Sequence, residues 1–83
     1  MIVIYGKSAC PYCVRATKLA QRYGLEYEYK NVDYEQFRTE LYDLKEDVTT
    51  VPQIWWHGRY VGGYTEFASE IENTRNYGDV SSF

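Results

Sequence analysis

Two cysteines, in the sequence Cys-Pro-Tyr-Cys at residues 10–13, constrain what this chain can fold into more than any other feature. An apolar run at residues 2–5 precedes them, and such runs are typical of a strand buried on both faces of a sheet. The apolar residues that follow recur at helical spacing and define one helix face: Ala16, Leu19, Ala20 and Tyr23. Pro11 suits the first position of that helix, because its fixed φ is favourable there and its missing N–H costs nothing. We therefore expect the pair at a strand-to-helix turn, with Cys10 as the N-cap.

The next part of the chain predicts a second strand and a second helix. Residues 27–32 alternate between apolar and charged side chains, which indicates a strand. With the first strand and helix, this strand forms a parallel βαβ unit. Asp33 is followed three residues later by Gln36, the spacing of a capping box. A second helix is therefore expected to begin at Asp33 and to end near Glu46.

The last part predicts a hairpin and a third helix. Strands are expected at residues 53–57 and 60–61, with a turn at residues 58–59. Thr65 is a suitable N-cap for the third helix and Gly78 a suitable end, which leaves the rest of the chain as a loose tail. The sequence therefore predicts a single domain over residues 1–83 with an α/β fold of order β-α-β-α-β-β-α. In this fold a mixed four-stranded sheet packs with three helices in two layers.

Composition argues against some classes of function. The 83 residues are 45% hydrophobic and 18% aromatic, which is enough for one compact core. The net charge of −3 argues against a nucleic-acid partner, because binding one needs a basic face. No apolar run approaches the roughly 20 residues of a membrane span, so we expect a cytoplasmic protein without a membrane partner. In that compartment a cysteine pair indicates redox chemistry or metal binding before a structural disulfide.

The charge is unevenly distributed, and the cysteines lie in the basic part of the chain. Residues 1–25 hold four basic side chains and no acidic one, whereas the remainder holds five basic and twelve acidic ones. The helix N-terminus and nearby Lys7 stabilise a Cys10 thiolate, so we expect the pKa of this thiol to lie below the usual value of about 8.5. Cys13, one turn into the helix, should be more buried, with its N–H directed at the Cys10 sulfur. We therefore predict that Cys10 attacks a substrate disulfide and that Cys13 resolves the mixed disulfide.

A Cys-x-x-Cys pair can also be half of a zinc site. Four-coordinate zinc needs two further ligands, and the chain has only one histidine, His57. A metal site within one chain is therefore incomplete, whereas a site shared by a dimer stays open, and we assign no metal ligands. Because a Cys-x-x-Cys that opens the helix of a βαβ unit is a fairly specific redox signature, redox chemistry is the favoured interpretation.

Three short motifs resemble those of the dithiol glutaredoxins, a family with a thioredoxin-like fold. They are Cys-Pro-Tyr-Cys at residues 10–13, Thr-Val-Pro-Gln-Ile at residues 50–54, and the Gly-Gly pair at residues 62–63. The resemblance covers nearly the whole chain. It implies a glutathione-dependent thiol–disulfide oxidoreductase that reduces protein disulfides and protein–glutathione mixed disulfides. It further implies a monomer without a bound cofactor, with glutathione as co-substrate and disulfide-containing proteins, ribonucleotide reductase among them, as partners.

The resemblance also implies which residues bind glutathione. Lys7 and Tyr12 would flank the reactive sulfur. The backbone of Val51 would pair with the peptide like a short antiparallel strand, and Pro52 would be cis. Arg38 would bind the glycine carboxylate, and backbone N–H groups at the start of the third helix would hold the γ-glutamyl end. The full predicted set is Lys7, Tyr12, Arg38, Thr50, Val51, Pro52, Gly63, Tyr64 and Thr65.

Thr65 departs from the pattern of the family, which usually has an aspartate that would meet the α-ammonium group of glutathione. A threonine supplies no charge there, whereas Glu66, at the next position, can compensate. Two alternative functions therefore stay open. One is a thioredoxin-like redoxin that is reduced by a flavoprotein reductase instead of glutathione. The other is a metal or iron–sulfur carrier with Cys10 and glutathione as ligands in a dimer.

Overall fold

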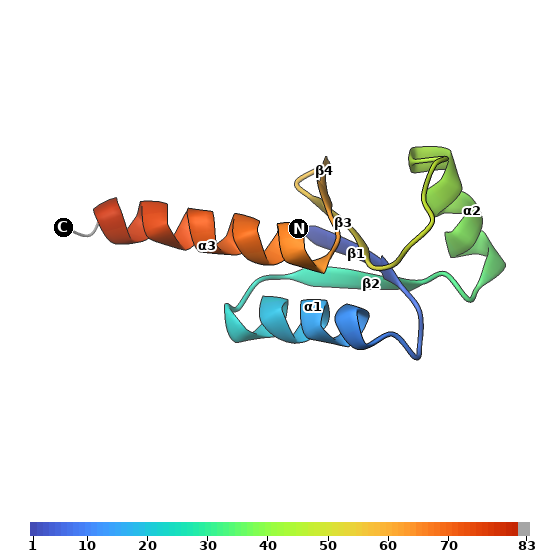
Figure 1. The fold of residues 1–83 in the computed structure, drawn as a ribbon, viewed down its shortest axis with the longest axis horizontal. Helices are drawn as coiled ribbons and strands as arrows, with labels where there is room; N and C mark the ends of the chain where they lie inside the picture. The colour runs from blue at the N-terminus through green and yellow to red at the C-terminus, as the bar shows by residue number, and fades with distance from the viewer. Residues whose placement is uncertain (82–83) are drawn as a thin grey trace.

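The computed structural model describes the backbone of residues 1–81 and the side chains of residues 1–73. Its elements follow the predicted order β-α-β-α-β-β-α (Figure 1). They are β1 (Ile2–Gly6), α1 (Pro11–Arg22), β2 (Tyr27–Asn31), α2 (Glu35–Leu44), β3 (Gln53–Trp56), β4 (Arg59–Gly62) and α3 (Tyr64–Ser81).

The four strands form one mixed sheet, as predicted, and their order is β2-β1-β3-β4. β1 runs parallel to β2, across the α1 crossover, and antiparallel to β3, which pairs with β4 in a hairpin. Ile4, in the middle of β1, is fully buried and lies between Tyr29 of β2 and Ile54 of β3. The apolar run in front of the cysteines is therefore a central strand.

The sheet has a core on each face. The larger core joins β1 and β3 to α1 and α3: Ile2, Ile4, Ala16, Ala20, Ile54, Phe67 and Ile71. The smaller core lies between the opposite face and α2 with the loop that follows it: Tyr5, Val32, Leu41 and Val48. The sheet is therefore the middle of three layers, and the predicted two-layer packing is wrong. Strand β1 can be covered on both faces because its successive side chains point to opposite faces of the sheet and are apolar on each face.

The β3–β4 hairpin turns one residue earlier than predicted. His57 (φ 53°) and Gly58 (φ 78°) both have left-handed backbone, and Trp56 pairs with Arg59 across the turn. Two consecutive positive φ angles are what a two-residue type I′ turn requires. A glycine is the obvious residue for such a turn, whereas positive φ at a histidine is uncommon and could not be predicted.

Helix α2 does not begin with the predicted capping box. Its N-cap is Tyr34, which makes no side-chain cap hydrogen bond, and the helix ends at Leu44, before Glu46. The Asp33 carboxylate instead accepts a hydrogen bond from the backbone N–H of Ser8 at 3.4 Å. The Asp33 side chain, which the local sequence predicted as the cap of α2, is therefore bound to the loop before the cysteines instead.

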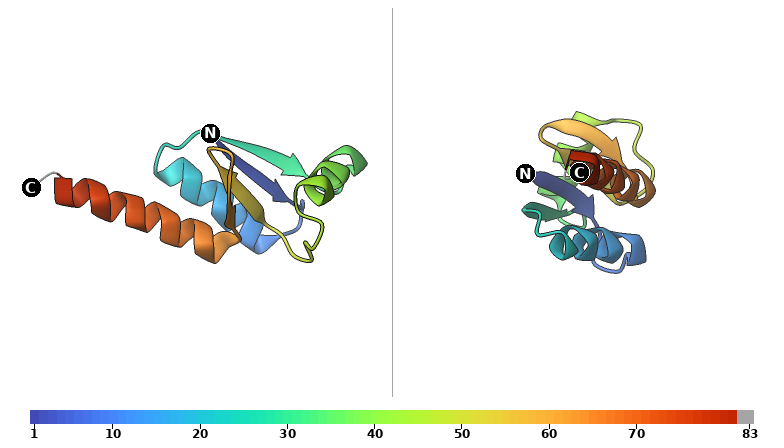
Figure 2. Two further views of the ribbon diagram at one scale, coloured as in Figure 1. Left: turned by 90° about the horizontal axis from the view of Figure 1, so that it is seen from above. Right: turned by 90° about the vertical axis from the view of Figure 1, so that its left-hand side faces the viewer.

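Helix α3 begins at Tyr64, so Thr65 lies inside the helix and is not its N-cap. The carbonyl oxygen of Gly63 accepts a hydrogen bond from the Phe67 N–H at 3.0 Å, so Gly63 occupies the N-cap position of α3. The helix also continues through Gly78 to Ser81, because one glycine in a helix costs only about 1 kcal/mol. Its far half projects well past the sheet (Figure 2). Of the predicted tail, residues 79–81 are helical and residues 82–83 lie outside the described residues.

Candidate active site at the cysteine turn

The two cysteines lie at the N-terminus of α1, and their sulfurs are joined in a disulfide. Cys10 is the N-cap, as predicted, and its Sγ accepts a hydrogen bond from the backbone N–H of Cys13 at 3.2 Å. Cys10 is half-buried, whereas Cys13 is fully buried, with 0% of its surface exposed. A reactant from solvent can therefore reach the Cys10 sulfur but not the Cys13 sulfur.

The loop in front of β3 lies against the reactive sulfur. The carbonyl oxygen of Val51 is 3.8 Å from the Sγ of Cys10, and the Val51–Pro52 peptide bond is cis, as the resemblance implied. This loop, Tyr12 and the start of α3 enclose an open cavity of about 220 Å³, which we call the aromatic cavity. Its lining is Tyr12, Thr50, Val51, Pro52, Gly63, Tyr64, Thr65 and Glu66. All of the predicted glutathione-binding residues except Lys7 and Arg38 therefore meet here.

Lys7 and Arg38 line a second cavity of about 220 Å³, which we call the basic cavity. The Nη1 of Arg38 donates a hydrogen bond to the carbonyl oxygen of Val32 at 3.3 Å, which holds its guanidinium beside β2. The two cavities share Thr50 and Val51. The predicted residues therefore line two neighbouring hollows along one short backbone segment. One holds the two cations together with Asp33, and the other holds the rings of Tyr12 and Tyr64.

Two tyrosine rings form one side of the aromatic cavity. The ring centroids of Tyr12 and Tyr64 are 5.9 Å apart with an angle of 40° between their planes, and the guanidinium carbon of Arg15 lies 5.2 Å from the centroid of Tyr12. Tyr12 is 54% exposed. Its ring is therefore free to contact a ligand that reaches the neighbouring Cys10.

Glu66 supplies the negative charge of the aromatic cavity. Its Oε1 accepts a hydrogen bond from the backbone N–H of Gly63 at 2.8 Å, so this carboxylate caps α3 from within. Gly62, with φ 127°, brings its backbone close to the same side chain, and a Cβ there would lie 2.9 Å from the Cβ of Glu66. The negative charge that Thr65 lacks is therefore supplied by the next residue, Glu66, at the N-terminus of α3.

The backbone of Lys7 is fixed by a tyrosine from β2. The Tyr29 hydroxyl donates a hydrogen bond to the carbonyl oxygen of Lys7 at 2.8 Å. Burial raises the pKa of Tyr29 above its usual value, and the charge of Asp33 raises it further. Tyr29 therefore stays a protonated donor at neutral pH.

Two residues outside the predicted set, Gln53 and Tyr60, hold the loop that carries Val51. Gln53 was part of a predicted motif but had no predicted role, and the signal that could have found it is a polar residue at the start of a strand rich in aromatic residues. Tyr60 carries no such signal.

A larger cavity of about 660 Å³ lies between the hairpin and α3, but it contains neither cysteine, so we place the site at the two smaller cavities.

The described residues offer no evident metal site or membrane span. No group of three or more histidine, cysteine, aspartate or glutamate side chains among them is placed to hold a metal ion. No helix within residues 1–81 is both long and apolar enough to cross a membrane.

A buried and an accessible cysteine in a disulfide at a helix N-terminus, on a thioredoxin-like fold, define a thiol–disulfide oxidoreductase. Comparison with known proteins narrows this class. The glutaredoxin family model matches residues 2–61, and the chain belongs to the glutaredoxin family of glutathione-dependent thiol–disulfide oxidoreductases.

Individual relatives agree with this assignment. The chain is 40% identical to glutaredoxin 1 of Escherichia coli over 77 residues, which cover 84% of this chain and 91% of that protein. It is 44% identical to a glutaredoxin of Pseudomonas aeruginosa over 63 residues, which cover 75% of this chain and 74% of the relative. The structure of reduced Escherichia coli glutaredoxin superposes with a TM-score of 0.73 at 36% identity, covering 90% of this chain and 96% of that one. The thioredoxin-like fold predicted from the sequence is therefore confirmed.

Proposed function

We propose that this protein reduces protein disulfides and protein–glutathione mixed disulfides, with Cys10 as the nucleophile and Cys13 as the resolving thiol. The observation that carries this assignment is the difference in accessibility between the two sulfurs. Cys10 is half-buried and receives an N–H from the helix N-terminus, whereas Cys13 is fully buried. An N–H directed at the Cys10 sulfur also stabilises its thiolate, which is the attacking form.

The reaction transfers two electrons from the cysteine pair to the substrate. The Cys10 thiolate attacks one sulfur of the substrate disulfide, which forms a Cys10–substrate disulfide and releases the other substrate sulfur as a thiolate that takes up a proton. The Cys13 thiol loses its proton and attacks the Cys10 sulfur, which releases the second substrate thiol and leaves the Cys10–Cys13 disulfide. The substrate is reduced and the protein is oxidised by the same electron pair.

Two glutathione molecules then restore the dithiol. The first glutathione thiolate attacks the Cys10 sulfur and frees Cys13, which takes up a proton. The second attacks the sulfur of the bound glutathione, so that Cys10 leaves as a thiolate and glutathione disulfide is released. No resident cofactor takes part in this sequence.

The arrangement of the two cavities supports the predicted glutathione site. The Val51 backbone, beside the Cys10 sulfur, would pair with the peptide of glutathione. Lys7 and Arg38 in the basic cavity would take the glycine carboxylate. In the aromatic cavity, Tyr12 would cover the glutathione sulfur, and the N–H groups of residues 64 and 65 would receive the γ-glutamyl carboxylate, because the N–H of Gly63 donates to Glu66.

Several wider expectations belong to the same proposal. We propose that residues 1–83 act as one monomeric domain in the cytoplasm. Ribonucleotide reductase is a candidate electron acceptor by analogy with the family.

Single-cysteine variants test the division of roles. Cys13→Ser keeps an accessible nucleophile, so we expect its activity on a glutathionylated peptide to stay within about threefold of the wild type, while reduction of a peptide disulfide is lost. Cys10→Ser loses both activities. The measurement is NADPH consumption coupled through glutathione and glutathione reductase. An inactive Cys13→Ser beside an active Cys10→Ser would reverse the assignment.

The electron donor is tested on the wild-type protein. The oxidised protein is incubated with glutathione alone and, separately, with thioredoxin reductase and NADPH, and free thiols are counted. Reduction by glutathione alone is the expected result. Reduction only in the reductase arm would show that the protein is a thioredoxin-like redoxin instead.

A further inference from the structure

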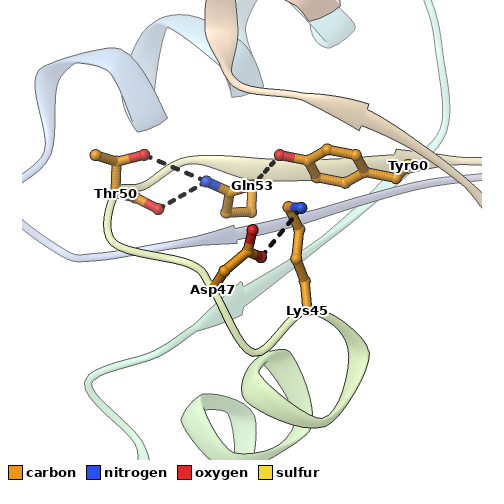
Figure 3. Close-up of polar contacts among 5 residues, drawn as sticks. All are labelled: Lys45, Asp47, Thr50, Gln53 and Tyr60. Carbon is orange, nitrogen blue, oxygen red and sulfur yellow. Dashed lines mark hydrogen bonds and ion pairs between the residues drawn. The ribbon is translucent and has the colours of Figure 1, made fainter.

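Gln53 is the only buried polar residue among residues 1–73, and it directly follows Pro52. Its Nε2 donates hydrogen bonds to the carbonyl oxygen of Thr50 at 3.0 Å and to the Thr50 hydroxyl at 3.3 Å. Its Oε1 accepts a hydrogen bond from the hydroxyl of Tyr60 on β4 (Figure 3). The amide nitrogen therefore binds the loop, and the amide oxygen binds the hairpin.

The partners of Gln53 fix the direction of its amide. The Thr50 carbonyl oxygen can only accept a hydrogen bond, so the NH₂ group must face the loop and the oxygen must face Tyr60. A reversed amide would place two acceptors against each other at Thr50, in a buried position where lost hydrogen bonds are costly. The Thr50 carbonyl therefore sets the direction of the amide, and the Tyr60 hydroxyl anchors the amide oxygen at its other end.

Tyr60 is itself held in place by neighbours from both sides. Its ring lies 4.9 Å from the ring of Trp55, and the Nζ of Lys45 lies 4.8 Å from its centroid. Lys45 also forms an ion pair with Asp47 at 3.2 Å, at the beginning of the same loop (Figure 3). The contacts through Tyr60 thus reach both ends of the segment that runs from α2 to Thr50.

The geometry points to a positioning role for Gln53 and Tyr60, which we call the Gln53–Tyr60 pair. By holding the Thr50 carbonyl and hydroxyl toward the sheet, the pair sets the backbone of Val51, whose carbonyl oxygen lies 3.8 Å from the Cys10 sulfur. We propose that the pair pre-orders this segment to receive the peptide backbone of glutathione. This inference rests on the proposed function, because it explains the fixed conformation of the loop by its role in binding glutathione.

Tyr60→Phe is the main test, because it removes one hydroxyl from a residue that is 44% exposed and leaves the ring in place. With the Gln53 oxygen unpaired, the amide loses its anchor on β4 and restrains the Thr50–Val51 segment less firmly. We expect the KM for glutathione to rise by about three- to tenfold with kcat within about twofold of the wild type. Tyr34→Phe, at a tyrosine that is 64% exposed on the N-cap of α2, is the matched control and should leave both values unchanged.

A second reductant separates positioning from damage to the cysteine turn. Dithiothreitol has no peptide to pair with Val51, so the rate at which it reduces the oxidised protein should be the same for the wild type and Tyr60→Phe. Gln53→Glu provides a stronger perturbation, because it keeps an acceptor for Tyr60 but places a carboxylate oxygen against the Thr50 carbonyl. We expect a larger rise in the KM for glutathione than in Tyr60→Phe.

The outcomes distinguish this inference from the proposed function. An unchanged KM in Tyr60→Phe would overturn the positioning role and leave the proposed function intact. Equal slowing with glutathione and with dithiothreitol would also overturn it, because the pair would then act on the disulfide or on the fold. A wild-type protein that glutathione fails to reduce, while dithiothreitol reduces it, would overturn both.

Discussion

Cys13 is buried because Gly6, at the end of β1, leaves room for its side chain. A Cβ at Gly6 would lie 2.8 Å from the Sγ of Cys13 and even closer to the Tyr29 hydroxyl. The difference in accessibility between the two sulfurs, on which their proposed roles depend, therefore needs a residue without a side chain in the neighbouring strand. The short strand in front of the cysteines thus shapes the site as well as the core.

Gly6→Ala should destabilise the protein and displace Cys13. The added methyl group cannot be accommodated without moving the sulfur or the tyrosine, so we expect the free energy of unfolding to fall by about 1–3 kcal/mol in urea titrations of the oxidised protein. Adding Tyr29→Phe removes the nearer obstacle and should restore only part of that loss. Stability within about 0.5 kcal/mol of the wild type in Gly6→Ala would contradict this account.

At the scale of the elements, the sequence predicted what depends on local patterns of residue types and missed what depends on particular side-chain contacts. The order of strands and helices, the N-cap at Cys10 and the parallel β1–β2 pair all follow from local patterns. The start of α2 was missed because the Asp33 carboxylate binds the N–H of Ser8. The start of α3 was missed because Glu66 reaches back to Gly63.

The candidate site shows the same division. The three motifs predicted the cysteine turn, the loop and the start of α3, and the structure brings them together. The Gln53–Tyr60 pair could not be predicted, because it depends on how β4 pairs with β3. That pairing is irregular between Ile54 and Trp55, so counting residues from the turn does not give the neighbour of Gln53.

A polar network between the sheet and α2 gives the fold a dependence on pH. The Glu40 carboxylate accepts hydrogen bonds from the Lys30 ammonium and the Tyr5 hydroxyl. The hydrogen bond from Lys30, followed by that from Tyr5, holds the pKa of Glu40 below its usual value. Burial, and then the hydrogen bond to Glu40, raise the pKa of Tyr5 well above its usual value. Glu40 is therefore ionised and Tyr5 is protonated throughout the neutral range.

The sign of the pH effect follows from the lowered pKa of Glu40. Its contribution to stability is present above the unfolded value of about 4.3 and is lost as the pH falls through the lower folded value. The wild type should therefore lose more stability than Glu40→Gln between about pH 5 and pH 3. Solvent screening of this partly exposed carboxylate keeps the difference below about 1 kcal/mol. Parallel urea titrations across this range would reveal it, and identical losses in the two proteins would show that the network carries no pH dependence.

At the scale of the whole molecule, the net charge of −3 hides a basic surface next to the site. Three exposed cations of α1, Arg15, Lys18 and Arg22, line one hollow with Tyr64, whose ring also borders the aromatic cavity. None of the three has an ion pair within the part of the chain that the structure describes. Tyr64 joins this hollow to the aromatic cavity beside Cys10, so the three cations lie close to the route by which a ligand reaches the sulfur.

Glutathione has two carboxylates and one ammonium at neutral pH, so its net negative charge should make its approach sensitive to this surface. Lys18→Glu reverses one charge without touching either cavity, and we expect kcat/KM for glutathione to fall by about two- to fivefold at low salt. The loss should largely disappear at about 0.5 M salt, where the Debye length is only a few ångströms. A stopped-flow measurement of the reduction of the oxidised protein gives this rate directly.

Arg59→Glu is the matched control, because it makes the same change in net charge on the exposed β4 strand, beside the larger cavity that contains neither cysteine. If the field near the site determines the rate of approach, Lys18→Glu slows the reaction with glutathione and Arg59→Glu leaves it nearly unchanged. Equal slowing in both variants would instead assign the effect to the net charge of the molecule. A loss in Lys18→Glu that persists at high salt would mean that Lys18 contacts the ligand, since screening removes long-range attraction but not a short contact.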